Sequence, residues 1–390
     1  MSVHSWKSGG KNIYFHIFML KHLFRFAFCA MFCCTFACNN NQPQKRAETA
    51  PLDTLKIEFA RGFSVAYYAD YKKVTLNTEN RIVYYLVKND SISTPPDGTK
   101  IIVPLARTVA STAPHYAFLD LLGEANSLIA VCSPQLVYNQ TIRTMFADGK
   151  IVDLGDALQI NVEKTLQLRP SAVIMSGYNS VDVNAERIAK AGIPVIFNNE
   201  WQESNVLGRA EWLKFVATFF DREATADSIF AKIADRYNSA KNSIPASERK
   251  PKVMSGGNFR GTWYMPGGQS YMAQLFGDAG ADYFYENDKS KKSLPLNFET
   301  VLKNFADADF WVNCDYVSFA QMLSADKKNL LFKPAKQGNV WNFNKRTLSN
   351  GANDFWESGV VRPDLLLLDL IYILHGQNTD YQTFYAKKLE

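Results

Sequence analysis

One helical pattern of apolar residues occupies the middle of the chain, from residue 205 to residue 242. Its apolar positions recur every three or four residues, as at Trp212, Phe215 and Phe219, which is typical of one buried face of an α-helix. An unbroken helix over residues 208–238 would measure about 45 Å at 1.5 Å per residue, which is long for a crossover helix within one sheet. The pattern therefore predicts a connection between two separately folded halves.

Short apolar runs alternate with helical patterns on both sides of this segment. "SLIAVC", "SAVIMSG" and "IPVIFNN" precede it, and "PKVMSGG" and "ADFWVNC" follow it. Buried runs separated by helices favour parallel βα units. We therefore expect an α/β fold with an N-terminal lobe (101–204), one long connecting helix (205–242) and a C-terminal lobe (251–376). Asp221 could cap a second helix, so a break there, or a helix pair packed within one domain, remains an alternative.

The segment before the first lobe has a different pattern. Residues 53–100 include "LKIEFARGFSVAYY" and "RIVYYLVK", in which apolar and polar residues alternate as they do in half-buried strands. We expect a small β-rich preface over these residues.

The first residues resemble a targeting segment. Lys21 and Arg25 precede the apolar run "FAFCAMFCCTFA", which is shorter than the roughly 20 residues of a membrane-spanning helix. The run ends in "TFAC", which resembles the lipobox of bacterial lipoproteins. This resemblance implies a signal peptide (1–37), a lipid on Cys38 and a polar tether (38–52). A secretory signal with an incidental cysteine is the alternative, and Met19 is a second possible start.

Charge and cysteine content exclude several classes of protein. The formal net charge is +5, and the four basic residues of segment 1–37, which has no acid, account for +4 of it. The remainder is almost neutral, so no nucleic-acid surface is expected. Four of the six cysteines lie at or before Cys38, and Cys132 and Cys314 are too few for a disulfide framework.

Several motifs together resemble one known family. They are "NVEKTLQLRPSAVIMSGY", "GRAEWLKFVATFF", "TWYMPGGQSYMAQLFGDAGADYFY" and "VVRPDLLLLDLIYILHG". Over about residues 100–376 they resemble the periplasmic substrate-binding proteins that serve ABC importers of iron complexes and cobalamin. The resemblance implies two α/β lobes, a ligand cleft between them and only small hinge movements. It also implies that Glu163 and Glu299, each in the first turn of a helix, contact the permease.

Candidate ligand-binding residues follow from the expected strand ends, because ligands of open α/β sheets bind at the carboxyl ends of the strands. Aromatic side chains are frequent there, which suits a large, flat, partly apolar ligand. Core packing is the alternative for each ring, since aromatic residues make up 13% of the chain. The candidates are His115, Tyr178, Trp201, Phe259, Arg260, Trp263, Tyr264, Tyr316 and Trp341, with Asp315 and Trp356 at the same strand ends.

These observations predict a binding protein with no catalytic activity and no cofactor of its own. The expected ligand is an iron chelate such as a siderophore or haem, with cobalamin or another corrinoid as the alternative. The expected partner is an ABC permease of the inner membrane, and the expected state is a monomeric lipoprotein of the cell envelope. A site for a bare metal ion is not expected, because His115 is the one histidine outside the leader and the last helix. A lipid-anchored hydrolase with His115 as its base is the remaining alternative.

Overall fold

The computed structural model of the chain describes residues 50–177, 182–244, 249–376 and 380–390. Pro51–Glu390 form one compact unit. The predicted signal peptide, Cys38 and most of the tether fall outside the described residues, as does Tyr178.

The first sheet contains five strands in their sequence order. β1 to β4 are antiparallel neighbours, and β5 runs parallel to β4. The strands are β1 (Asp53–Thr54), β2 (Phe63–Tyr67), β3 (Tyr71–Leu76), β4 (Ile82–Val87) and β5 (Thr99–Ile102).

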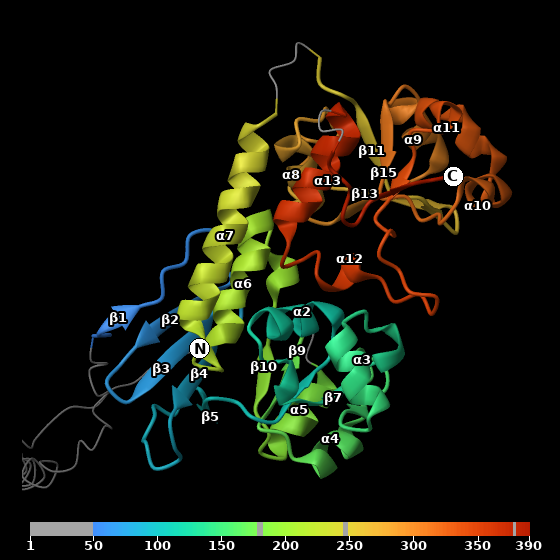
Figure 1. Cartoon of the computed structure of the whole chain (residues 1–390). Coiled ribbons are helices and arrows are strands. Elements are labelled where there is room, and N and C mark those ends of the chain that lie inside the picture. The colour runs from blue at the N-terminus through green and yellow to red at the C-terminus, as the bar shows by residue number, and fades with distance from the viewer. Residues whose placement is uncertain (1–49, 178–181, 245–248, 377–379) are drawn as a thin grey trace, which may run out of the picture. The chain divides into compact units, whose positions relative to one another are not determined.

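The N-terminal lobe contains a wholly parallel sheet in the order β10-β9-β6-β7-β8. α2 and α3 cover one face of it, and α4 and α5 cover the other (Figure 1). Its strands are β6 (Thr108–Ala110), β7 (Leu128–Val131), β8 (Val152–Asp153), β9 (Ala172–Met175) and β10 (Val195–Phe197). Its helices are α2 (Ala113–Leu121), α3 (Gln140–Ala147), α4 (Val162–Leu168) and α5 (Val183–Lys190), with short 3-10 turns η1 (Ala125–Ser127), η2 (Pro134–Leu136) and η3 (Glu200–Gln202).

The central segment forms two helices, α6 (Val206–Thr218) and α7 (Glu223–Asn242), which pack against each other. The expectation of one connecting helix over residues 205–242 is therefore wrong, and the alternative of a break at Asp221 is confirmed. The chain turns at Asp221, which has a left-handed backbone with φ of 55°. Aspartate tolerates this conformation better than most residues. The single long helix that leads to the C-terminal lobe is α7, and it has 20 residues.

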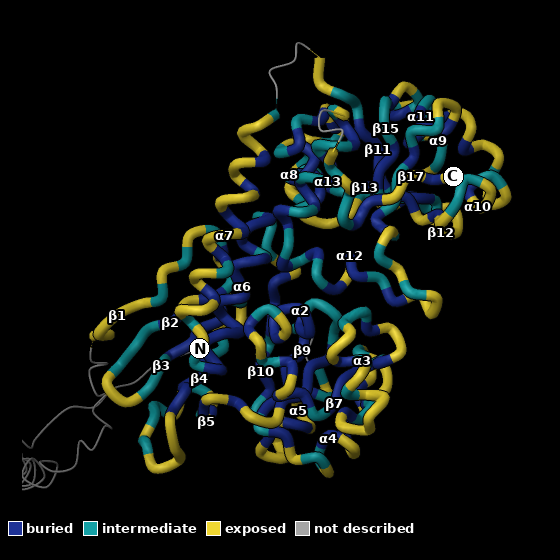
Figure 2. The backbone as a smooth tube through the Cα atoms, viewed as in Figure 1, coloured by how far each residue is buried: buried dark blue, intermediate teal, exposed yellow. Residues whose placement is uncertain are grey.

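α6 is buried on all sides because the first sheet packs against it (Figure 2). Phe63 of β2 lies 5.0 Å from Trp212 and 5.4 Å from Phe215, measured between ring centroids. The carboxylate of Glu211 accepts hydrogen bonds of 2.7–3.2 Å from the backbone N–H groups of residues 58–60. The β-rich preface is thus attached to α6 by ring packing and by one buried acid.

The C-terminal lobe is built around two parallel strands, β11 (Val253–Ser255) and β15 (Phe310–Val312). Parallel bridges from Lys252 to Asp282 and from Trp311 to Val340 extend this pair on both sides. An antiparallel sheet contains β12 (Asn258–Phe259), β13 (Thr262–Pro266) and β14 (Ser293–Leu296), and β16 (Trp341–Asn342) pairs with β17 (Lys387–Lys388). The helices are α8 (Tyr271–Asp278), α9 (Phe298–Phe305), α10 (Phe319–Ala325), α11 (Lys333–Gln337), α12 (Asp354–Glu357) and α13 (Pro363–His375), with η4 at Lys327–Leu331.

Candidate functional site

The carboxyl ends of β11 and β15 form one wall of a cavity in the C-terminal lobe. Ser255 and Val312 are register partners at the ends of these strands, so the loops that follow them begin side by side. Gly257 leaves room for Asp315, because a Cβ atom at Gly257 would lie 2.7 Å from Oδ2 of Asp315 and the carboxylate would have to move. The strand ends therefore bring a glycine pair and a carboxylate together.

We call this space the strand-end cavity, and its volume is about 430 Å³, within the range of small-molecule sites. Two aromatic side chains in its wall are open to solvent, with 51% of Tyr264 and 60% of Trp356 exposed. Its wall is made by Gly256, Gly257, Tyr264, Asn313, Cys314, Asp315, Asn342, Phe343, Asn353, Phe355 and Trp356.

The polar groups of the strand-end cavity are one carboxylate and three side-chain amides. Asp315 remains open to solvent on one side, and partial desolvation against the cavity wall raises its pKa. The amide nitrogen of Asn342 donates to the carbonyl oxygen of Tyr316 at 2.9 Å, and that of Asn353 donates to the carbonyl oxygen of Phe343 at 3.0 Å. No basic side chain occurs among the residues that line this cavity.

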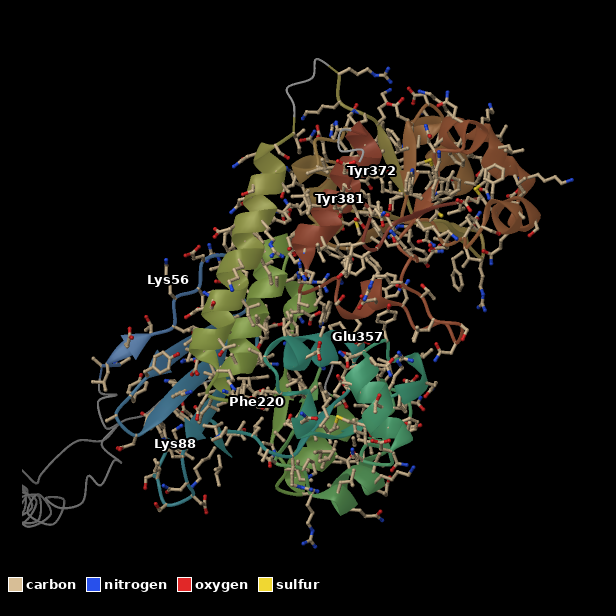
Figure 3. All side chains as sticks on the ribbon, in the orientation of Figure 1. Lys56, Lys88, Phe220, Glu357, Tyr372 and Tyr381 are labelled. Carbon is tan, nitrogen blue, oxygen red and sulfur yellow. The ribbon has the colours of Figure 1, made fainter. Side chains whose placement is uncertain are left out.

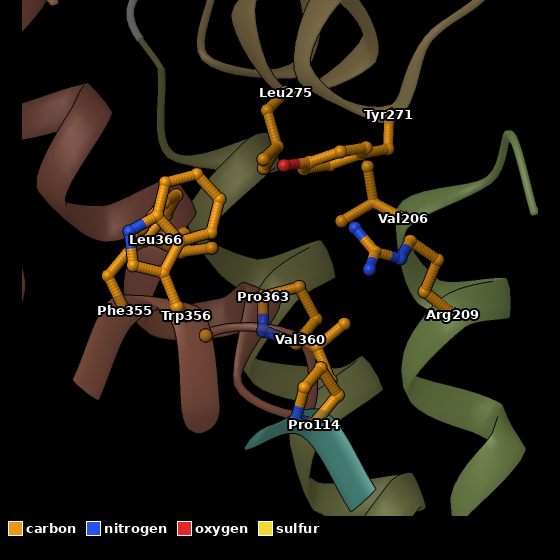
Figure 4. A pocket seen from close by; sticks show the side chains of 11 residues that line it. Pro114, Val206, Arg209, Tyr271, Leu275, Phe355, Trp356, Val360, Pro363 and Leu366 are labelled. Carbon is orange, nitrogen blue, oxygen red and sulfur yellow. The ribbon is translucent and has the colours of Figure 1, made fainter. Parts of the chain in front are cut away.

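A second space of about 90 Å³, which we call the junction cavity, has walls from both lobes (Figure 4). Pro114 comes from the N-terminal lobe, Arg209 from α6 and Tyr271 from α8. Phe355 and Trp356 line this cavity as well as the strand-end cavity. The two spaces are therefore neighbours that share two aromatic residues.

Arg209 joins the lobes at the junction cavity. Its Nη2 donates to Oε1 of Glu200 at 3.1 Å, and its guanidinium lies over the ring of Tyr271 with 4.4 Å to the centroid. Glu200 is 2% exposed, and burial raises the pKa of this carboxyl although Arg209 lowers it. The sequence did not single out Arg209, because an arginine on a helix has no distinctive local pattern.

The predicted aromatic candidates separate into cavity, core and surface residues. Tyr264 lines the strand-end cavity. Trp263 is fully buried, and its indole N–H donates to the carbonyl oxygen of Ser255 at 2.8 Å. Tyr316 is buried too, and its hydroxyl accepts from Asn329 at 3.3 Å. The predictions that Trp263 and Tyr316 line the cleft are therefore wrong, because both side chains belong to the C-terminal core.

The other candidates lie outside both cavities. Phe259 is 58% exposed, and the guanidinium of Arg260 lies over its ring at 5.1 Å from the centroid. Trp201 is 39% exposed, and Trp341 is half-buried near Tyr372, with 6.3 Å between their ring centroids. Their role in ligand binding stays a prediction.

His115 is 1% exposed beneath Pro114 in the first turn of α2. Its two ring nitrogens have no hydrogen-bond partner among the described residues. Burial lowers its pKa to about 4, so the ring is neutral at pH 7. The prediction that His115 contacts the ligand is therefore corrected, because the ring is buried and lines neither cavity.

Glu163 and Glu299 occupy equivalent positions in the two lobes. Each is exposed in the first turn of a helix, α4 and α9, whose preceding asparagine caps it. Asn161 accepts from the N–H of Lys164 at 2.9 Å, and Asn297 accepts from that of Thr300 at 2.8 Å. Glu163 also forms an exposed ion pair of 2.8 Å with Arg187. Such a pair costs little to break.

Three further features of the described residues bear on function. These residues contain no group of three or more histidine, cysteine or acidic side chains that could hold a metal ion. Cys132 and Cys314 are buried free thiols, and burial raises the pKa of each to about 12. None of the helices in the described part of the chain is long and apolar enough to cross a membrane.

Comparison with known proteins identifies similar chains. The profile of the family described as "Periplasmic binding protein" matches residues 117–337. An uncharacterized lipoprotein of Methanocaldococcus jannaschii is 26% identical over 312 residues, which cover 75% of this chain and 72% of that protein.

Solved structures show the same fold at low sequence identity. A periplasmic binding protein from Veillonella parvula has a TM-score of 0.57 and 13% identity, over 78% of this chain and 98% of that one. A periplasmic heme binding protein from Pseudomonas aeruginosa has a TM-score of 0.54 and 16% identity, over 73% of this chain and 98% of that one. The predicted two-lobed α/β fold class is confirmed.

Proposed function

The chain belongs to the periplasmic binding protein family, and on that premise we propose that it captures an iron chelate between its lobes and delivers it to an ABC permease. The observation that carries the proposal is the strand-end cavity, which lies beside the junction cavity and presents exposed Tyr264 and Trp356. Rings that remain exposed beside a cavity are suited to contact the apolar face of a large ligand.

The polar groups of the strand-end cavity indicate which kind of iron chelate it would bind. The wall offers Asp315 and side-chain amides and has no cation. An anionic group such as a haem propionate has no counter-charge on this wall, whereas a neutral or cationic hydroxamate chelate meets hydrogen-bond acceptors. A ferric hydroxamate is therefore the form of iron chelate that the C-terminal wall favours.

A corrinoid is the second candidate, and the same wall supports it. The periphery of cobalamin carries amide groups, which both donate and accept hydrogen bonds and need no charged partner. Asn342, Asn353 and Asp315 offer matching groups. The choice between a hydroxamate chelate and a corrinoid belongs to experiment.

Delivery of the chelate to the permease would use Glu163 and Glu299. Both are exposed at equivalent positions on the two lobes, which supports a role in contacting the permease. The lipoprotein naming of the archaeal relative supports a membrane anchor, for which Cys38 is the proposed site. We propose that the protein acts as a monomer with no catalytic activity.

The proposal is tested by fluorescence titration with a ferric trihydroxamate, haem and cyanocobalamin in parallel. We expect one-to-one binding with Kd below about 1 μM for at least one of them. Tyr264→Ala should weaken binding by 10- to 100-fold, because a buried aromatic contact contributes roughly 1.5–3 kcal/mol. Phe284→Ala is the matched control, since this ring is 56% exposed and lines neither cavity. Equal effects of the two variants would refute the assignment of the site.

A further inference from the structure

One segment of the C-terminal lobe crosses to the N-terminal lobe. We call residues 341–362, which run from β16 to the start of α13, the strap. Phe343 and Phe355 of the strap pack in the core of the C-terminal lobe, whereas Val361 packs in the core of the N-terminal lobe. α12 lies in the strap and packs against α2 (Figure 1).

Glu357, at the end of α12, forms a buried polar connection between the strap and the N-terminal lobe (Figure 3). Its Oε2 accepts from the backbone N–H of Tyr138 at 2.7 Å, and its Oε1 accepts from that of Asn139 at 3.0 Å. The side chain is 3% exposed. Hydrogen bonds to a carboxylate are among the stronger ones in proteins, so both oxygens hold the same turn of the opposite lobe.

Further contacts of the strap reach the same turn. The side-chain amide of Asn350 donates to the carbonyl oxygen of Gln135 at 2.7 Å. The guanidinium of Arg346 lies 5.1 Å from the ring centroid of Tyr138, and its Nε donates to Asp354 at 2.6 Å. The strap is thus fixed to residues 135–139 at three points.

The place of Glu357 in the sequence connects this attachment to the ligand site. Its neighbour Trp356 lines both cavities and is 60% exposed. The carboxylate of Glu357 is bound to the N-terminal lobe, while the ring of Phe355 is packed in the C-terminal core. Trp356 stands between these two anchored neighbours, so its position depends on both.

We propose that Glu357 is a positioning residue for ligand binding, which clamps α12 to Tyr138 and Asn139 and thereby holds Trp356 where the two cavities meet. This inference rests on the proposed function, because it concerns the same ligand. The clamp also limits how far the lobes separate at this side of the cleft, and so selects ligands by size.

The test compares Glu357→Gln with Glu203→Gln in the full-length protein purified in detergent, at pH 8, which lies above the pKa of about 7 to which burial raises Glu357. Glu203 is the control at a different place, because its Oε1 accepts the backbone N–H groups of Arg61 and Gly62, both at 2.8 Å, and the indole N–H of Trp212 at 3.1 Å. It joins the preface to the segment before α6 and lines neither cavity. At Glu357, where each oxygen accepts one N–H, a glutamine keeps one acceptor oxygen and leaves one of these N–H groups without a partner.

Two measurements decide the proposal. The first is amide hydrogen exchange at Tyr138 and Asn139. The amide that loses its acceptor should exchange at least 10-fold faster in Glu357→Gln, and both amides should stay unchanged in Glu203→Gln. The second is the Kd for a ferric trihydroxamate and for cyanocobalamin, which should rise about 10-fold in Glu357→Gln alone.

A double variant separates positioning from general loss of structure. If Glu357 acts through Trp356, then Glu357→Gln adds no further loss of affinity to Trp356→Ala. Additive losses, or unchanged exchange at the two amides, would overturn the proposal. If the wild type binds neither probe, the proposed function fails and the ligand role of Glu357 fails with it, while the exchange rates still decide whether the clamp exists.

Discussion

The dependence of stability on pH should reveal two buried groups with opposite effects. Burial raises the pKa of Glu357 from 4.5 to about 7, although the N–H groups of Tyr138 and Asn139 lower it. Burial lowers the pKa of His115 from 6.5 to about 4. Each change corresponds to about 3 kcal/mol, at 1.36 kcal/mol for each pH unit.

The direction in which each contribution to stability changes with pH depends on whether the folded or the unfolded state binds the proton. Between pH 4.5 and 7 the folded protein holds a proton on Glu357 that the unfolded chain has lost, so the contribution of Glu357 to stability falls as pH rises. Between pH 6.5 and 4 the unfolded chain protonates His115 and the folded protein does not, so the contribution of His115 falls as pH falls. The two effects offset each other from about pH 4.5 to 6.5.

Urea unfolding of the wild type and two variants at pH 4, 5, 6, 7 and 8 would measure both contributions. The unfolding free energy of the wild type minus that of Glu357→Gln should fall by about 3 kcal/mol between pH 4.5 and 7. The unfolding free energy of the wild type minus that of His115→Phe should rise by about 3 kcal/mol between pH 4 and 6.5. Differences that stay constant with pH would refute the reasoning, because they would mean that neither group is held at a shifted pKa by the fold.

Three other outcomes follow from the structure. Glu211→Gln should lower the unfolding free energy by about 2 kcal/mol and expose the preface to proteolysis, because a glutamine leaves a buried N–H unpartnered; equal digestion of variant and wild type would contradict this. Glu163→Ala with Glu299→Ala should preserve ligand affinity and abolish stimulation of permease ATPase activity in proteoliposomes, and retained stimulation would exclude the docking role. Cys132 and Cys314 should react with iodoacetamide in urea and not in the native protein, and rapid native labelling would show that these thiols are accessible.

The fold class could be predicted because buried runs and helical patterns are local features of the sequence. The break between α6 and α7 was an alternative but not the expectation, since it depends on tertiary contacts. Asp221 pairs with Lys72 of β3 and with Lys88, the residue after β4, both far away in the chain. The sequence offered Asp221 only as a possible cap, without showing what would hold the turn.

The candidate site was predicted in part, and the errors have a common cause. Trp263 and Tyr264 are neighbours in β13, so their side chains point to opposite faces of the sheet. The sequence marked both, and only the packing of the sheet decides that Trp263 is in the core and Tyr264 is at the cavity. Glu357 was missed for a related reason, because the two N–H groups that give it a role lie in the other lobe.

The central claim is that the cleft binds one metal chelate without transforming it. The most direct test is isothermal titration of the wild-type protein with a ferric trihydroxamate and with cyanocobalamin, followed by recovery and analysis of the ligand. The account predicts a one-to-one complex with Kd below about 1 μM for at least one of them, and a ligand recovered unchanged. Folded protein that binds neither, or a ligand recovered chemically altered, would contradict it.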